Sequence, residues 1–189
     1  MEGREMNGKI TLLGDSIRFI GYGKKLPELL GEEFTVFQPN ENCRFSKYTL
    51  RGVMVNWAAD IADSDIIHWN NGLWDTMDHG EGVLTSEDEY VANMIRIADI
   101  LKKRAKKVIF ATTTPVAPDY QYSNIERIER YNAILVPELE KRGIIINDMY
   151  SFVQPNIDTY IRKDDHIHLT EEGIWACAKR VKEVILENL

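Results

Sequence analysis

Short apolar runs alternate with longer amphipathic segments along the whole chain. Five of these runs are too uniformly apolar for strands with one side facing solvent, and they are typical of parallel strands that are covered on both faces. We therefore expect strands over residues 9–13, 34–37, 65–69, 107–111 and 143–147.

Three longer segments carry apolar residues at helical spacing. They cover residues 86–104, residues 123–142, which Gly143 is placed to terminate, and the stretch after Thr170, a favourable N-cap residue. Strands that alternate with helices in this way predict an α/β fold, namely a three-layer α/β/α sandwich around a five-stranded parallel sheet. The length of the chain suits one such domain spanning residues 1–189.

The longest segments without a regular pattern are residues 71–85 and 151–168, which follow the third and the fifth expected strands. In an open parallel sheet, ligands bind at the carboxyl ends of the strands. Both segments belong at that edge, so we expect the functional site there.

Composition and charge exclude several classes of partner. The formal net charge of −7 argues against nucleic acid or an anionic membrane as a partner. No apolar run is long enough to cross a bilayer, and the polar stretch 1–6 lacks the apolar segment of a signal peptide. Cys43 and Cys177 are too few and too far apart for a disulfide framework. We expect a cytoplasmic protein. The sequence leaves open whether it forms homo-oligomers.

A candidate nucleophile follows the first expected strand, in the tripeptide Gly14-Asp15-Ser16. A serine just past a strand tip is exposed at the site edge of the sheet, and Gly14 allows a tight turn. Backbone N–H groups from Ser16 onward could then point at a developing oxyanion. The alternative is an ordinary turn, since all three residue types are common in turns.

A candidate base and its orienting carboxylate precede the last helix, where Asp165 and His168 lie three residues apart. A nucleophilic serine needs a base to accept its proton, and that base needs a carboxylate to hold its tautomer. This pair supplies both groups locally, and His168 can face the serine across the edge of the sheet.

The same loop also allows a metal site with Asp164, His166 and His168 as ligands. His68 or His79 could complete such a site. The metal interpretation is the weaker one, because no pair of cysteines and no His-x-x-x-His helix supplies further ligands. We therefore expect neither a metal nor a cofactor.

The two blocks in combination resemble the SGNH/GDSL hydrolase family, whose first and last blocks are similar to residues 14–18 and 165–170 here. The resemblance covers almost the whole chain in the order of its elements. It implies a flavodoxin-like sandwich and a triad of Ser16, Asp165 and His168. The implied activity is hydrolysis of an ester or thioester without a metal.

In that family the oxyanion hole is shared by the serine N–H, a glycine N–H after the second strand and an asparagine side chain after the third. No glycine follows the second strand here, and Cys43 or Arg44 stands about where it should be. A backbone N–H donor survives that change. Cys43 is also an alternative nucleophile, since Arg44 could lower its pKa, but no histidine lies near it in sequence.

After the third strand, Gly72 and Asp75 match the family's block and Trp74 replaces its asparagine. A sub-branch of the family looks similar, with Asn-x-Gly-Leu-His-Asp at this place. An indole N–H can donate a hydrogen bond as an amide can. Asn70 or Asn71 supplies the donor instead if the loop is shifted, and Trp74 is then a pocket wall or a core aromatic residue.

Aromatic residues gather in the loops and suit sugar faces, acyl chains or ordinary packing: Trp69, Trp74, Tyr120, Tyr122, Tyr150 and Tyr160. Arg18 and Arg44 flank the expected pocket and could bind a carboxylate or phosphate. We expect an esterase for small acyl groups, for example O-acetyl esters of a carbohydrate or another polar metabolite. The departures from the family pattern leave a non-catalytic binding protein on the same scaffold as the alternative.

Overall fold

The computed structural model describes residues 8–189, so the polar stretch 1–6 lies outside the described residues. Its centre is a five-stranded sheet in which every neighbouring pair is parallel. The strands are β1 (Gly8–Leu13), β2 (Phe34–Phe37), β3 (Ser64–Asn70), β4 (Ala105–Ala111) and β5 (Ile145–Asn147). All five expected strands are confirmed, with shifts of one or two residues at their ends.

The strand order is β2-β1-β3-β4-β5, the order of a flavodoxin-like sheet. The chain places β2 on one side of β1 and β3 on the other side, where Leu13 pairs with Trp69. In such sheets this switch point opens the crevice in which ligands bind. The loops after β1 and β3 therefore lie side by side at the expected site.

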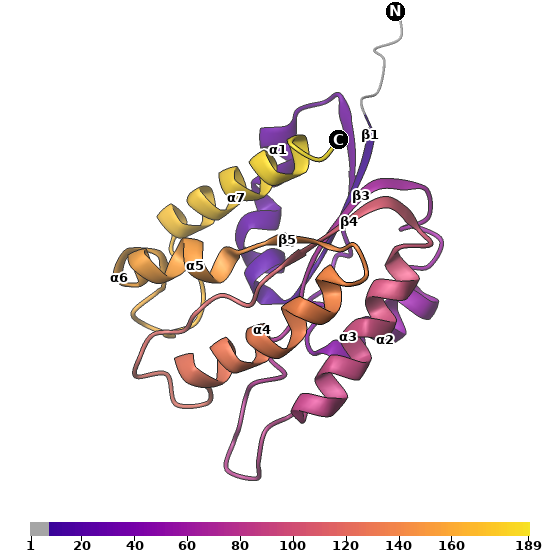
Figure 1. Ribbon diagram of the computed structural model, residues 1–189. Coiled ribbons are helices and arrows are strands. Elements are labelled where there is room, and N and C mark those ends of the chain that lie inside the picture. The colour runs from indigo at the N-terminus through magenta and orange to yellow at the C-terminus, as the bar shows by residue number, and fades with distance from the viewer. Residues whose placement is uncertain (1–7) are drawn as a thin grey trace, which may run out of the picture.

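Helices cover both faces of the sheet and complete the three layers (Figure 1). One face carries α1 (Leu26–Leu30), α5 (Met149–Val153), α6 (Ile157–Tyr160) and α7 (Glu171–Leu186), and the other carries α2 (Ser46–Arg51), α3 (Glu87–Leu101) and α4 (Ile125–Glu140). Short helical turns add η1 (Ile17–Gly21), η2 (Tyr22–Lys24), η3 (Gly52–Asn56) and η4 (Gln154–Asn156). Each face buries its own apolar cluster, which fixes the sheet between the two helical layers.

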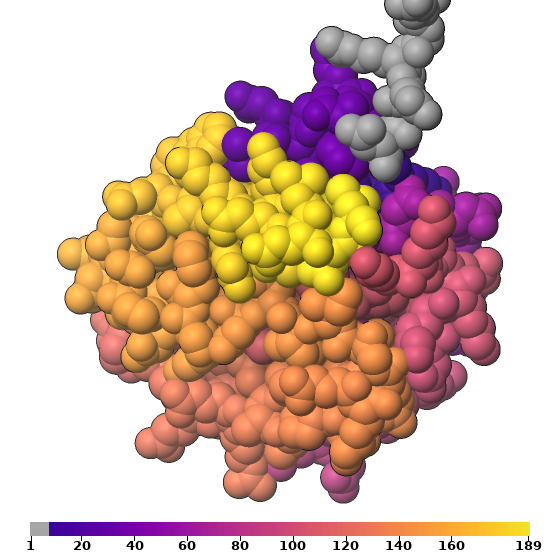
Figure 2. All heavy atoms as spheres, turned by 45° about the horizontal axis from the view of Figure 1, so that its top comes forward, coloured from indigo at the N-terminus to yellow at the C-terminus, as the bar shows by residue number. Residues whose placement is uncertain are grey.

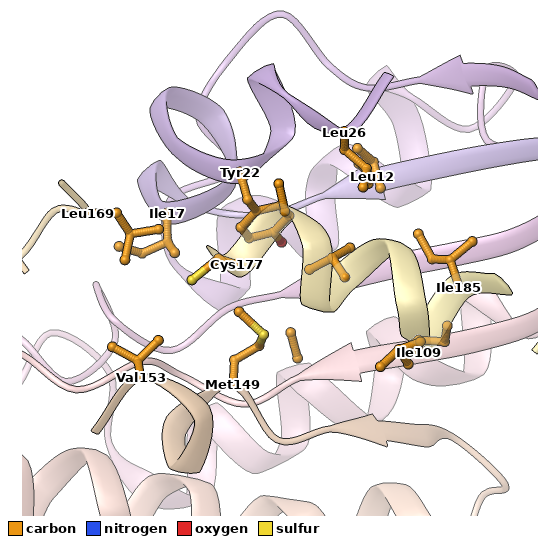
Figure 3. Packing of buried hydrophobic residues seen from close by; sticks show 14 of the residues in the cluster. Leu12, Ile17, Tyr22, Leu26, Ile109, Met149, Val153, Leu169, Cys177 and Ile185 are labelled. Atoms are coloured by element: carbon orange, nitrogen blue, oxygen red, sulfur yellow. The ribbon is translucent and has the colours of Figure 1, made fainter. Parts of the chain in front are cut away.

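The last helix packs against the beginning of the chain. Figure 2 shows α7 in yellow beside the indigo N-terminal segment, and α1 contacts α7. The apolar stripe expected on α7 is confirmed, since Cys177, Val181 and Ile185 are fully buried. Figure 3 shows Cys177 and Ile185 on the inner side of this helix. Within residues 8–189 no helix combines the length and the apolar composition that crossing a bilayer requires.

The N-cap expected at Thr170 is confirmed, and Ser86 takes the same role for α3, which was not anticipated. Ser86 and Thr170 each accept a hydrogen bond from a backbone N–H in the first turn of the helix that follows. Gly143 lies three residues after the end of α4 and has a φ of 72°, in the left-handed region that commonly follows a helix. These features need only a few neighbouring residues, which is why the sequence shows them.

The expectation of an irregular segment over residues 151–168 is wrong in part, because α6, η4 and the end of α5 lie there. These helices are too short to show a period in sequence, and isolated helices of this length are not stable. They form because tertiary packing buries side chains such as Met149 and Val153.

Candidate active site

Ser16 lies three residues after the end of β1, at the switch point of the sheet. The turn is held by Asp15, whose Oδ1 accepts hydrogen bonds from the Ile17 N–H (3.0 Å) and from the Asn70 amide (2.8 Å). Ser16 itself is 7% exposed, and its backbone N–H has no hydrogen-bond partner within residues 8–189. The serine is thus held on a fixed turn beside the end of β3, with one donor unused.

Gly14 is needed at this turn because the space beside it is already filled. A Cβ atom on Gly14 would lie 2.0 Å from Oδ1 of Asn70 and 2.9 Å from Cβ of Arg18. Any side chain here would displace the Asn70 amide that binds Asp15. The glycine therefore serves close packing of the nucleophile turn.

Arg18 is 1% exposed and acts within the fold, so the expectation that it binds an anionic ligand is wrong. Its guanidinium donates to the carbonyl oxygens of Gly14 (3.2 Å), Pro39 (2.9 Å) and Glu41 (2.6 Å). These bonds offset the cost of burying the guanidinium. Its Nε–H has no hydrogen-bond partner within residues 8–189. Arg18 therefore joins the loop after β1 to the loop after β2.

The candidate base is held by its carboxylate. Nδ1 of His168 lies 3.0 Å from Oδ2 of Asp165, and Oδ1 of Asp165 accepts the backbone N–H groups of Ile167 (3.1 Å) and His168 (2.9 Å). Nε of Arg162, three residues earlier, lies 3.4 Å from the same carboxylate and was not anticipated from the sequence. Asp165 can therefore hold the orientation of the imidazole.

The carboxylate of Asp165 is kept in its charged form. Partial burial works to raise its pKa, but the backbone N–H groups of His168 and Ile167 and the His168 side chain together bring the pKa below its ordinary value. A carboxylate whose pKa is lowered in this way favours the charged form that a histidine base needs as its partner.

The two halves of the candidate triad lie at the same edge of the sheet. Ile17 and Leu169, the residues directly after Ser16 and His168, lie close together (Figure 3). A Cβ atom on Gly21 would lie 3.4 Å from Cδ1 of Leu169 and 4.0 Å from the carbonyl oxygen of Ser16. No hydrogen bond within residues 8–189 joins Ser16 to His168, and such bonds often tighten only when substrate binds.

The three ligands of the metal interpretation do not converge. Asp164 pairs with Arg162, and Nδ1 of His166 lies 2.7 Å from Oδ1 of Asp119. His168 faces the triad carboxylate instead. The described part of the chain contains no group of three His, Cys, Asp or Glu side chains that could hold a metal ion.

The two remaining histidines lie elsewhere. His68 is fully buried between Asn147 and the hydroxyl of Tyr22, and burial lowers its pKa to about 3, so it stays neutral. His79 lies on the exposed loop after β3, beside the ring of Tyr122. Neither can complete a site with the loop before α7.

The loop after β2 uses both backbone donors that the sequence suggested for the oxyanion hole, so that expectation is wrong. The Cys43 N–H donates to the carbonyl of Gly14 (3.0 Å), and the Arg44 N–H donates to Oδ1 of Asn42 (2.7 Å). Arg44 has a φ of 53°, which turns the chain sharply at this point. The next N–H, of Phe45, has no hydrogen-bond partner within residues 8–189.

The side chains of this loop do not favour a cysteine nucleophile or an arginine inside a pocket. Cys43 is fully buried, and burial raises the pKa of its thiol even though the guanidinium of Arg18 lies 3.5 Å away. A buried neutral thiol is a poor nucleophile. Arg44 is exposed, and its guanidinium lies over the ring of Tyr48 at 4.8 Å.

Both asparagines suggested as oxyanion donors have structural partners. Asn70 donates to Asp15, as described above, and Asn71 donates to the carbonyl of Arg44 (2.8 Å) while accepting from the indole of Trp69 (2.8 Å). The two amides tie the loops after β1 and β2 to the end of β3. These hydrogen bonds hold both side chains in place within the fold.

Trp74 keeps a free donor. It is half-buried, and its Nε1–H has no hydrogen-bond partner within residues 8–189. The backbone before it is fixed at Gly72, where a Cβ would lie 2.1 Å from Oγ1 of Thr113. The residue after it, Asp75, is fully buried and accepts the N–H and hydroxyl of Ser46. The indole is therefore carried by a rigid turn that follows β3.

Most of the aromatic residues singled out in the loops do not reach this site. Trp69 is fully buried against Phe110, with ring centroids 4.9 Å apart. Tyr150 donates to Glu129 on α4 (2.7 Å), and Tyr160 packs against α5. Apart from Trp74, this leaves Tyr120 and Tyr122, which lie together.

The raised pKa of Asp15 makes the stability of the fold depend on pH, which can be tested. Burial raises its pKa to about 6, although the hydrogen bonds from Asn70 and Ile17 work in the opposite direction. The folded protein therefore holds this proton more tightly than the unfolded chain, and wild-type stability falls as the pH rises from about 4 to about 6. Asp15→Asn keeps the accepting oxygen and cannot ionise.

We expect Asp15→Asn to have the higher free energy of unfolding above pH 6, by at most about 3 kcal/mol, and this difference to shrink towards pH 4. Chemical denaturation of both proteins at the two ends of this range measures it. A difference that is the same at both pH values would contradict the raised pKa.

No protein-family profile matches the chain, and no curated protein matches its sequence. Solved structures do match its fold. A catalytic mutant of the acetylxylan esterase Axe2 from Geobacillus stearothermophilus superposes with a TM-score of 0.80 at 15% identity, over 95% of this chain and 94% of that one. The acetyl xylan esterase AlAXEase gives 0.75 at 18% identity, over 94% and 99%.

A lipase/acylhydrolase from Enterococcus faecalis gives a TM-score of 0.76 at 16% identity, over 94% of each chain. At such low identity these similarities establish the fold. The chain has the α/β fold of these proteins, with a five-stranded parallel sheet, in agreement with the SGNH/GDSL resemblance of its two end blocks.

Proposed function

We propose that the protein is a serine esterase with Ser16 as nucleophile, His168 as base and Asp165 as the orienting carboxylate. The observation that carries the proposal is the Asp165–His168 pair, held by three hydrogen bonds at the same edge of the sheet as the serine turn. A nucleophile, a base and an orienting group in this arrangement define acyl transfer by a triad.

The reaction has two steps. The hydroxyl of Ser16 attacks the ester carbonyl while His168 takes its proton, and His168 then gives that proton to the departing alcohol. A water molecule that loses its proton to His168 then attacks the acyl-serine. His168 returns this proton to the Ser16 oxygen as the acid leaves, which restores both residues. Asp165 stays ionised throughout and stabilises the charged imidazole.

The candidate oxyanion donors are the backbone N–H groups of Ser16 and Phe45 and the indole N–H of Trp74, none of which has a hydrogen-bond partner within residues 8–189. They come from the loops after β1, β2 and β3, which the buried hydrogen bonds of Arg18 and Asn71 hold together. In this proposal Trp74 takes the place of the family's asparagine.

The similar structures support the reaction class and a small acyl group. Two of the matched proteins are acetylxylan esterases. The catalytic mutants of Axe2 replace a serine, an aspartate and a histidine, and the aspartate lies three positions before the histidine. Asp165 and His168 have the same spacing. We therefore propose O-acetyl esters of a carbohydrate or a similar polar molecule as substrates, bound without a metal or cofactor.

Labelling with a fluorophosphonate tests the activated serine directly. We expect one adduct per chain, located on Ser16 by peptide mass spectrometry and absent from Ser16→Ala. Acetate release from an acetylated sugar should disappear in the same variant. Folded protein that forms no adduct and releases no acetate would contradict the esterase and favour a binding protein on the same scaffold.

A further inference from the structure

An aromatic surface lies beside the catalytic loop and has no part in the proposed triad. It consists of His79 from the loop after β3 and Tyr120 and Tyr122 from the loop after β4. The ring centroids of His79 and Tyr122 are 4.4 Å apart with 36° between the planes, and Tyr120 meets Tyr122 edge-on at 5.7 Å. We call these three residues the aromatic platform.

The platform is open to solvent. Tyr122 is 42% exposed, His79 is also exposed, and Tyr120 is half-buried. Neither tyrosine hydroxyl has a hydrogen-bond partner within residues 8–189. Two exposed rings in contact, with free polar groups at their edges, offer a ligand both an apolar face and hydrogen-bonding groups.

Hydrogen bonds connect the platform to the loop of the candidate base. The Ala117 N–H donates to the carbonyl of His166 (2.8 Å), and Asp119 pairs with the imidazole of the same residue (2.7 Å). The pKa of Tyr120 is raised by burial and further by Tyr122 and Asp165, which places the triad carboxylate within electrostatic reach. The platform therefore adjoins the place where an ester would react.

The loop that carries His79 is also fixed. The Asp78 N–H donates to the carbonyl of Tyr122 (2.7 Å), and the Asp78 carboxylate accepts the N–H groups of Gly80 (2.8 Å) and Gly82 (3.1 Å). The two loops are thus joined at the residues that bear the rings. A platform held in this way loses little conformational entropy on binding.

We propose that the platform binds a sugar ring of the alcohol part of the substrate, with Tyr122 as its main contact. This inference rests on the proposed function. A sugar ring has an apolar C–H face that packs on an aromatic ring, and hydroxyls at its rim that match the free phenol groups of Tyr120 and Tyr122. A long acyl chain would need an enclosed apolar channel, whereas this surface is open and has polar edges.

The test compares a large and a small substrate. For acetylated xylo-oligosaccharides we expect Tyr122→Ala to raise KM about tenfold, because the C–H face of the sugar ring loses its aromatic contact. For p-nitrophenyl acetate, which has no sugar ring, kcat/KM should stay within twofold. Tyr122→Phe keeps the ring and should retain most of the affinity, and Tyr150→Ala, remote from the platform, should change neither substrate.

Binding of xylotriose, which has no ester, separates the platform from the reaction. Isothermal titration calorimetry should detect binding to wild-type protein and loss of binding in Tyr122→Ala. If binding is lost as expected but wild-type protein releases no acetate and takes no fluorophosphonate, the proposed function is wrong and the platform stands. If the wild-type enzyme is active and Tyr122→Ala leaves KM and xylotriose binding unchanged, the platform proposal is overturned.

Discussion

Replacing His168 by alanine is expected to lower kcat/KM for an acetyl ester by about 10⁴-fold or more, because the serine then lacks a base. The fold should tolerate the change. The side chain is 25% exposed and its one polar contact is with Asp165, so we expect the free energy of unfolding to change by about 1 kcal/mol or less. Steady-state kinetics and denaturant unfolding of the same preparation measure both effects.

Two controls in the same loop separate the triad from a metal site. His166→Ala removes an imidazole that pairs with Asp119, and Asp164→Asn removes a carboxylate that pairs with Arg162. We expect each to keep activity within about tenfold of wild type, because neither touches the reacting atoms. Loss of activity in all three variants, together with inhibition by a chelator, would reject the triad and favour metal-dependent hydrolysis.

Trp74→Phe is expected to lower kcat by about 10²–10³-fold with little change in KM, the size of effect seen when one oxyanion donor is removed. The substitution keeps an aromatic side chain and removes only the indole N–H. That N–H has no hydrogen-bond partner within residues 8–189, so the fold should lose no hydrogen bond. Steady-state kinetics with p-nitrophenyl acetate measure the effect without any contribution from a bound sugar ring.

Trp175→Phe is the matched control, since this indole N–H donates to Glu171 on the surface of α7 (3.1 Å). Its kcat should equal that of wild type. If Trp74→Phe also keeps kcat within about twofold, the backbone N–H groups of Ser16 and Phe45 suffice for the oxyanion. Trp74 would then be a wall of the pocket, and the departure from the family pattern would have no catalytic consequence.

The sequence by itself determined where the five strands and the long helices lie along the chain. It also identified the two parts of the candidate triad, Ser16 and the Asp165–His168 pair. These features rest on local physics. A buried parallel strand is a run of apolar residues, a helix start such as Thr170 shows in the few residues around it, and Asp165 reaches His168 across three residues. No distant part of the chain is needed to form any of them.

Only the tertiary structure decided which polar groups near the serine are free. Arg18, Asn70 and Asn71 have the side chains of a binding site, but partners 20 or more residues away bind them within the fold. The aromatic platform likewise depends on His79 meeting Tyr122 across a gap of more than 40 residues. Sequence patterns report the local chain, whereas the burial and pairing of a side chain depend on which distant loops the sheet brings to the same edge.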